Sequence, residues 1–291
     1  MTSPNQLDDH IGATETANDF ASPTISLGLS AVLDKPASSD ALSQPFFPVA
    51  HWLLFKPTAS MSELGEDGHP RLGGFIPDLG LPRRMWAGSE ITYHHPIQHG
   101  QRVDRTSTIE SITPKHGSSG KLCFVTLKHE VSTDEGPALT ELQTLVYREA
   151  AQPSPIAPTV NHPPRPDSEV PSDWDWGSSQ RLNTVMLFRY SALTFNAHRI
   201  HYDLPYATRQ EGYPGVVAHG PLMATLLVDA FLQEHPGAEL TSYKFSARAP
   251  IFAGEQVHLV GKTDSNDGQR AELAVIGPDG KPAVTGAISF R

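Results

Sequence analysis

A duplicated motif constrains the fold of this chain more than any other feature of its sequence. The pattern Pro-Ile-x-x-Gly-x-x-Val occupies residues 96–103 and occurs again at residues 250–257. A second matched element follows each time, Pro-Ala-Leu-Thr at residues 137–140 and Pro-Ala-Val-Thr at residues 282–285. Two matches in the same order predict a structural unit that occurs twice. The alternative is that both motifs merely mark strand–turn–strand connections.

Within each half the pattern is mostly that of antiparallel strands. Segments such as VTLKHEVS, LQTLVYRE, QVHLVGKT and AISFR alternate or run apolar between Gly, Asp and Pro clusters. One long helix is predicted over Pro221–His235, where a proline lies in the first turn and the interior is almost continuously apolar. One helix and several strands, occurring twice, predict an α+β fold. In each repeat a curved antiparallel sheet would wrap a long helix, with the two sheets joined edge to edge.

Proline usage divides the chain. Seven of the 26 prolines fall within residues 151–172, and such a density removes backbone donors and favours an extended linker. The first forty residues are rich in polar side chains and are expected to be a loose tail, in which residues 25–33 could form a short helix. The expected parts are a tail (1–41), an N-terminal half (42–150), the proline-rich linker (151–172) and a C-terminal half (173–291).

Charge and cysteine content exclude several classes of protein. Lys and Arg total 22 against 32 Asp and Glu, a formal net charge of −10, so no nucleic-acid partner is expected. The only cysteine is Cys123, which leaves no internal disulfide and no thiol-based zinc site. The apolar run at residues 222–228 is far shorter than the ~20 residues of a membrane span. Residues 1–20 lack an apolar core and carry acids, so we expect a cytoplasmic protein without membrane contact.

The segment that precedes the predicted helix carries a family resemblance. It reads Leu-Thr-Phe-Asn-Ala-His-Arg-Ile-His-Tyr-Asp at residues 193–203, and Val-Ala-His-Gly follows at residues 217–220. This resembles the signature of the MaoC-like enoyl-CoA hydratases, Leu-Thr-Gly-Asp-x-Asn-Pro-Leu-His-x-Asp and then His-Gly at the start of the central helix. The resemblance implies a double hot-dog fold, a CoA thioester as substrate, no further cofactor and a homodimer.

The sequence departs from that signature where the acid–base chemistry lies. The family's histidine is kept as His201, but Asn196 stands in place of the aspartate and His198 in place of the asparagine. An amide accepts no proton near neutral pH, so Asn196 is expected only to orient water or a substrate oxygen. Acid–base work then falls on His201, with His198 either sharing it or fixing a tautomer.

Neighbouring residues are candidates for binding the substrate. Backbone N–H groups near His219 and Gly220, at the start of the predicted helix, could stabilise negative charge on the thioester oxygen. Tyr202 and Arg199 lie on the resembling loop, and Arg199 is a candidate for the CoA phosphates. The spacing of His198 and His201 is compatible with metal ligation, but no carboxylate or thiol pattern accompanies it, so no metal is expected.

The resemblance is closest to the hydratases of mesaconyl-CoA and itaconyl-CoA and their dehydratase relatives. The N-terminal half lacks the catalytic pattern, and its long glycine-rich segment, residues 51–88, is expected to form a pocket wall. Within it, Arg83 and Arg84 could bind the second carboxylate of a dicarboxylic acyl group. The alternatives are a 3-hydroxyacyl-thioester dehydratase of the fatty-acid type, a hot-dog thioesterase and a non-catalytic acyl-CoA-binding protein.

Overall fold

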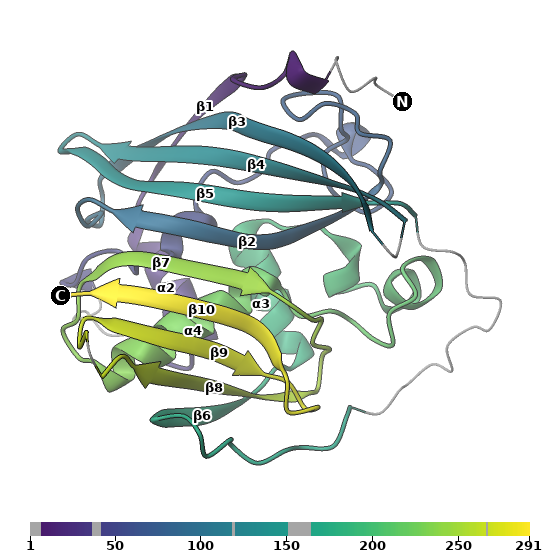
Figure 1. Ribbon diagram of the computed structural model, residues 1–291. Helices are drawn as coiled ribbons and strands as arrows, with labels where there is room; N and C mark the ends of the chain where they lie inside the picture. Colours follow the sequence, from purple (N-terminus) through teal and green to yellow (C-terminus); the bar gives the residue numbers. More distant parts are fainter. Residues whose placement is uncertain (1–6, 37–41, 118–119, 151–163, 266) are drawn as a thin grey trace.

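The computed structural model describes residues 7–36, 42–117, 120–150, 164–265 and 267–291. Within these residues, ten antiparallel strands form one continuous sheet in the order β1-β3-β4-β5-β2-β7-β10-β9-β8-β6. Figure 1 shows the helices gathered behind this sheet, with β1 and β6 at its two edges. This is the α+β architecture that the repeated strand pattern predicts.

The two halves contribute five strands each. The N-terminal half supplies β1 (Thr14–Phe20), α2 (Pro23–Val32), β2 (Arg83–Tyr93), β3 (Arg102–Gly117), β4 (Gly120–Thr133) and β5 (Gly136–Arg148), with 3-10 turns at Ala50–Leu53 and Met61–Glu63. The C-terminal half supplies β6 (Trp176–Arg181), α3 (Thr184–Thr194), α4 (Gly220–Glu234), β7 (Leu240–Ala247), β8 (Gln256–Thr263), β9 (Arg270–Ile276) and β10 (Pro282–Phe290), with a 3-10 turn at Arg199–His201 and a π-helical turn at Tyr206–Gln210.

Strand order confirms the duplication. The N-terminal half reads β1-β3-β4-β5-β2 from the edge inward, and the C-terminal half reads β6-β8-β9-β10-β7, so each strand has a counterpart at the same position. The motif glycines occupy equivalent turns: Gly100 and Gly254 have φ of 83° and 92°, a conformation that glycine adopts without strain. Their N–H groups donate to Ala21 and Leu182, the residues that directly follow β1 and β6.

The sheets join where β2 pairs with β7, in a register that runs from Gly88 opposite Ser246 to Thr92 opposite Ser242. A side chain at Gly88 would lie 2.3 Å from the carbonyl oxygen of Phe245, so only glycine allows the strands to approach here. Edge-to-edge joining therefore follows the prediction, and it removes one exposed edge from each half.

The expectation of a loose tail over residues 1–41 is wrong for the described part, residues 7–36. Strand β1 pairs with β3 along its whole length, and α2 begins at Pro23, where the side chain of Ser22 accepts from the N–H of Thr24. The short helix foreseen over residues 25–33 is confirmed. The strand escaped sequence analysis because its side chains, TETANDF, are exposed or half-buried at a sheet edge and show no apolar alternation.

Helix α4 forms the centre of the C-terminal half, as predicted. Every residue from Leu222 to Phe231 is buried, which explains the nearly continuous apolar sequence, since each large apolar side chain stabilises the fold by roughly 1.5–3 kcal/mol when buried. In the N-terminal half the corresponding place holds only the turn Ala50–Leu53, and residues 54–82 run as a long irregular segment. The N-terminal half thus keeps the sheet and shortens the helix.

The linker predicted over residues 151–172 falls largely on residues 151–163, which lie outside the described residues. Its described end runs along the C-terminal half, where Arg165 makes paired hydrogen bonds of 2.6 and 2.8 Å to the buried Glu255. Residues 164–175 join no strand, as expected for a proline-rich stretch. In the described part of the chain, the apolar helices are all too short to cross a membrane.

Candidate active site

The loop between α3 and α4 folds tightly because of two local features. Helix α3 ends at Phe195, which adopts a left-handed conformation with φ of 51°. The next residue, Asn196, accepts a hydrogen bond of 2.9 Å through its Oδ1 from the backbone N–H of His198, the usual asparagine turn. With Oδ1 occupied, the free end of the Asn196 amide is its NH₂ group, which donates and does not accept.

His201 lies buried in the 3-10 turn that follows. Its Nδ1–H donates to the carbonyl oxygen of Val217 over 2.8 Å, so Nε2 carries the lone pair. Burial lowers the pKa of His201 to about 4. The ring is therefore neutral at pH 7, with a proton-accepting nitrogen in a fixed orientation.

His219 directly precedes α4 and stacks on His201, with ring centroids 3.7 Å apart and planes inclined by 19°. Its Nε2 is 2.8 Å from the hydroxyl of Ser191, and burial lowers its pKa well below the usual value. Gly220 opens the helix, and no side chain caps this end. The first-turn N–H groups of a helix have no intrahelical acceptor, so those beside His219 are available to a ligand.

His198 occupies the middle of the cluster. Its ring centroid lies 5.3 Å from that of His201 and 4.3 Å from that of His69. Burial, and the charges of the neighbouring imidazoles and Arg84, lower the pKa of His198 strongly. The two histidines of the sequence prediction are thus side by side, and a third, from the other half of the chain, completes the row.

His69 and its partner Asp67 escaped sequence analysis. The Asp67 carboxylate accepts from the ring Nδ1–H of His69 over 2.8 Å and from the His69 backbone N–H over 3.0 Å. Gly68, between them, has φ of 92°, and a side chain there would come within 2.0 Å of the Ala197 carbonyl oxygen. Segment 54–82 therefore packs directly against the loop between α3 and α4, which supports the expectation of a pocket wall. An Asp-Gly-His turn within a glycine-rich segment was the available signal.

The structure gives the two candidate arginines different partners. Arg83 is bound to the carboxylate of Glu211 and lies over the ring of Tyr213. Arg84, the next residue along β2, acts on the histidine cluster through its charge, which helps to lower the pKa values of Asp67, His69 and His198. Among the described residues Arg84 has neither an ion pair nor a hydrogen bond.

The other two predicted binding residues face outward. Arg199 makes paired hydrogen bonds of 2.9 and 2.8 Å to Asp203 and lies over the ring of Tyr206. Tyr202 is 53% exposed, and its hydroxyl donates to the Ala197 carbonyl oxygen. These contacts brace the loop, and Arg199 is already neutralised by a carboxylate.

Asp67, His69 and His198 also present ligand atoms within 4.8 Å of one another, so their spacing would suit a metal ion. Two features oppose a cation here. The Nδ1–H of His69 already donates to Asp67, and the positive charge of Arg84 acts on all three groups.

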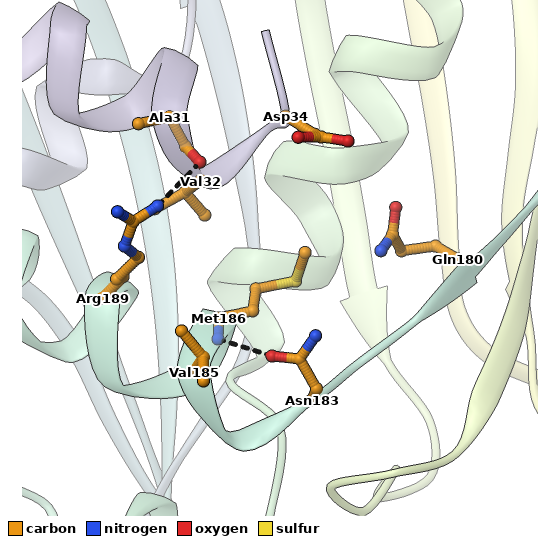
Figure 2. Close-up of a pocket in the computed structure, with 8 residues that line it drawn as sticks. All are labelled: Ala31, Val32, Asp34, Gln180, Asn183, Val185, Met186 and Arg189. Atoms are coloured by element: carbon orange, nitrogen blue, oxygen red, sulfur yellow. Dashed lines mark hydrogen bonds between the residues drawn. The ribbon is translucent and has the colours of Figure 1, made fainter.

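A surface pocket of about 270 Å³ lies elsewhere, between α2 and α3 (Figure 2). Asn183, which caps α3 by accepting from the N–H of Met186, and Arg189, which donates to the Ala31 carbonyl oxygen, form part of its wall. None of the histidines lines it, so this pocket is not part of the predicted chemistry.

Comparison with known proteins places the chain. The sequence model of a family described as hydroxyacyl-thioester dehydratase type 2 matches residues 49–253. The chain belongs to this dehydratase family. It is 39% identical over 280 residues, 96% of both chains, to the mesaconyl-C(4)-CoA hydratase of Chloroflexus aurantiacus. It is 25% identical to the mitochondrial hydroxyacyl-thioester dehydratase type 2 of Schizosaccharomyces pombe, over 76% of this chain and 79% of that one.

Solved structures agree on the fold of this dehydratase family member. A MaoC-like dehydratase from Phytophthora capsici superimposes with a TM-score of 0.67 at 14% identity, over 100% of this chain and 99% of that one. A Mycobacterium tuberculosis protein described as a double hot-dog fold superimposes with a TM-score of 0.58 at 10% identity, over 98% and 97%. The predicted double hot-dog is confirmed, and as a member of the dehydratase family the protein is an enzyme of the hydro-lyase class.

Proposed function

We propose that this enzyme adds water reversibly to the double bond of a short, branched, dicarboxylic enoyl-CoA of the mesaconyl or itaconyl type. The observation that carries the proposal is Arg84, a cation with no ion pair or hydrogen bond among the described residues, whose charge acts on the buried His198. A monocarboxylic acyl chain gives that charge nothing to bind, whereas a dicarboxylic one does. The 39% identity to a mesaconyl-C(4)-CoA hydratase supports the same substrate class.

The position of the carboxylate fits this geometry. In mesaconic acid with the thioester on C4, the remaining carboxylate sits on the β-carbon, the atom that water attacks. The base that activates the water and the cation that holds the carboxylate must therefore lie within a few ångströms of each other. The charge of Arg84 acts on His198, whose ring contacts that of His201, whereas Arg83 is already held by Glu211.

In this proposal His201 takes the proton from the attacking water. Its Nδ1–H is fixed on Val217, so Nε2 accepts the proton as the water oxygen bonds to the β-carbon. The NH₂ group of Asn196, whose Oδ1 holds the loop, orients the water as a donor. The backbone N–H of Gly220 stabilises the negative charge on the thioester oxygen, aided by the positive end of the α4 dipole.

A 3-hydroxyacyl-thioester dehydratase of the fatty-acid type is the second candidate, because the family description and the Schizosaccharomyces relative both name that activity. The two candidates differ in what Arg84 does. A fatty-acyl substrate leaves the guanidinium unpaired in a half-buried position, which is costly. A dicarboxylic substrate neutralises it.

A substrate panel with two arginine variants tests the proposal. Purified enzyme is assayed with mesaconyl-CoA, itaconyl-CoA, crotonyl-CoA and a long-chain enoyl-CoA, and products are identified by mass spectrometry. We expect turnover of the dicarboxylic esters without release of free CoA thiol. Arg84→Met should raise KM for them at least about tenfold, the scale of one charge-assisted contact, and leave crotonyl-CoA turnover nearly unchanged. Arg102→Met, an exposed arginine on β3 paired with Asp104, is the matched control.

Three outcomes would refute the assignment. A preference for long straight chains would move the enzyme to the fatty-acid type, and release of thiol would make it a thioesterase. Equal effects of Arg84→Met on all esters would assign that residue to folding or to CoA.

We further propose that the enzyme is a cytoplasmic homodimer. Light scattering at the monomer mass would contradict the dimer.

A further inference from the structure

The Asp67–His69 pair has no place in the mechanism described above, although it lies in the same site. Both residues come from segment 54–82 of the N-terminal half, and the His69 ring contacts that of His198, with 4.3 Å between centroids. The side chain of His69 is 20% exposed, more open than the almost fully buried His201 and His219. The pair is therefore a carboxylate-oriented imidazole at the accessible side of the histidine row.

Hydration of an enoyl thioester needs two proton transfers. One proton leaves the water that attacks the β-carbon, and one arrives at the α-carbon. The catalytic loop of the C-terminal half supplies His201 for the first transfer, but Asn196 holds no exchangeable acid proton near neutral pH. If the second transfer uses a separate acid–base group, that group comes from outside this loop.

On the basis of the proposed hydratase function, we propose that the Asp67–His69 pair is this second group and exchanges the proton at the α-carbon. In hydration an O–H bond of water breaks as the oxygen bonds to the β-carbon, and that proton goes to Nε2 of His201. The Nε2–H bond of protonated His69 breaks as the α-carbon gains its proton. His69 is left neutral, with its Nδ1–H still on Asp67. In dehydration each transfer runs in reverse.

One proton has then moved from His69 to His201, and it must return before the next turnover. His198 lies between the two rings, 4.3 Å from His69 and 5.3 Å from His201. Its position suits a relay of that proton back to His69. This gives His198 a role that neither of the two sequence alternatives contained.

Burial and the Arg84 charge lower the pKa of His69 too, but among the clustered histidines it is the one with a carboxylate at hydrogen-bond distance. An imidazolium at His69 faces the Asp67 carboxylate at hydrogen-bond distance, which stabilises it. A proton on His198 would lie among imidazoles and the Arg84 charge, and one on His219 would be fully buried against His201. Binding of a substrate carboxylate to Arg84 would neutralise the one cation that opposes protonation of His69.

Exchange of α-hydrogens in D₂O separates the two transfers. Methylsuccinyl-CoA has the proposed substrate's carboxylate but neither the double bond nor the β-hydroxyl, so it reports only on the group that acts at the α-carbon. Deuterium uptake is followed by mass spectrometry for wild type and for His69→Ala, Asp67→Asn and His201→Ala. Glu66→Gln removes an exposed charge from the same segment and is the matched control.

We expect wild type and His201→Ala to exchange at similar rates and His69→Ala to lose at least ~100-fold, the scale of general acid–base catalysis. Asp67→Asn keeps an oxygen for the His69 backbone N–H but loses the charge. It should lower exchange and the hydration kcat at least ~10-fold with KM unchanged. His69→Asn, with a similar polar side chain, serves if the alanine variant does not fold.

Several results would overturn the assignment. They are exchange in folded His69 variants above half the wild-type rate, loss of exchange in His201→Ala alone, and no exchange by a wild-type enzyme that hydrates its substrate. Activity abolished by a chelator and restored by Zn²⁺ would make Asp67 and His69 metal ligands instead. A wild type that hydrates only monocarboxylic esters would refute the proposed substrate class. Deuterium exchange with butyryl-CoA would still test the role of His69.

Discussion

Replacing His201 by Asn should make the stability of the enzyme less sensitive to acid. The Asn side chain can still donate to Val217 through its NH₂ group but does not titrate. In the wild type, burial holds the pKa of His201 at about 4, against 6.5 for the free side chain. The unfolded chain therefore binds a proton between these two values that the folded chain does not bind, and stability falls as pH drops from about 6.5 to about 4.

The size of the effect follows from the two pKa values. The stabilising contribution of neutral His201 is fully present above pH 6.5, the unfolded pKa. Between pH 7 and pH 5, linkage with these values predicts a loss of about 2 kcal/mol from this one side chain. His198 and His219 stay in both proteins, so their own contributions largely cancel in the comparison.

Urea unfolding of wild type and His201→Asn at pH 7 and pH 5, followed by circular dichroism at fixed protein concentration, measures this difference. The drop in unfolding free energy between the two pH values should be about 2 kcal/mol smaller in the variant. Equal drops in both proteins would show that His201 titrates normally in the folded state. The proposed mechanism, which depends on a buried and neutral base, would then be wrong.

Other substitutions test the same loop through activity and stability. His201→Ala should lower kcat by about 10²- to 10⁴-fold with the fold intact. A folded variant with more than a tenth of wild-type activity would contradict the assignment of His201 as the base. His198→Ala should lose less activity than His201→Ala, because the proposed role of that ring is only to relay a proton. Asn196→Asp keeps the turn and should retain measurable activity, whereas Asn196→Ala should be worse, which steady-state kinetics will show. Gly68→Ala would place a methyl group 2.0 Å from the Ala197 carbonyl oxygen at a residue with φ of 92°, so it should displace the segment and lower both kcat and the Tm measured by calorimetry.

The repeated parts of this protein could be predicted from its sequence, whereas the contacts between the repeats could not. The matched motifs identified equivalent turns because the positive φ of Gly100 and Gly254 is a local requirement that favours glycine. The buried helix around Leu222–Phe231 was visible for the same kind of reason, since burial on all sides leaves a continuous apolar run. Strand β1 has no such signature because it lies at an edge.

In the candidate site, too, the residues that are close in sequence could be predicted and those that meet through tertiary structure could not. His201, Asn196 and His198 lie within six residues of one another, and local spacing was enough to group them. Asp67 and His69 are some 130 residues away and meet that loop only through the joined sheets. Likewise, no sequence pattern separates Arg83 from Arg84. The pairing of Arg83 with Glu211 arises from tertiary structure alone.

The loss of the long helix from the N-terminal half has a consequence for how such an enzyme diversifies. Segment 54–82 follows the short turn that stands in place of a second central helix, and it contacts the loop between α3 and α4 through Gly68 and Asp67. Changes in this segment can therefore alter one wall of the candidate site while the loop between α3 and α4 stays unchanged. Duplication has left two copies of one unit that contribute different parts to the same site, a histidine loop from one copy and an irregular segment from the other.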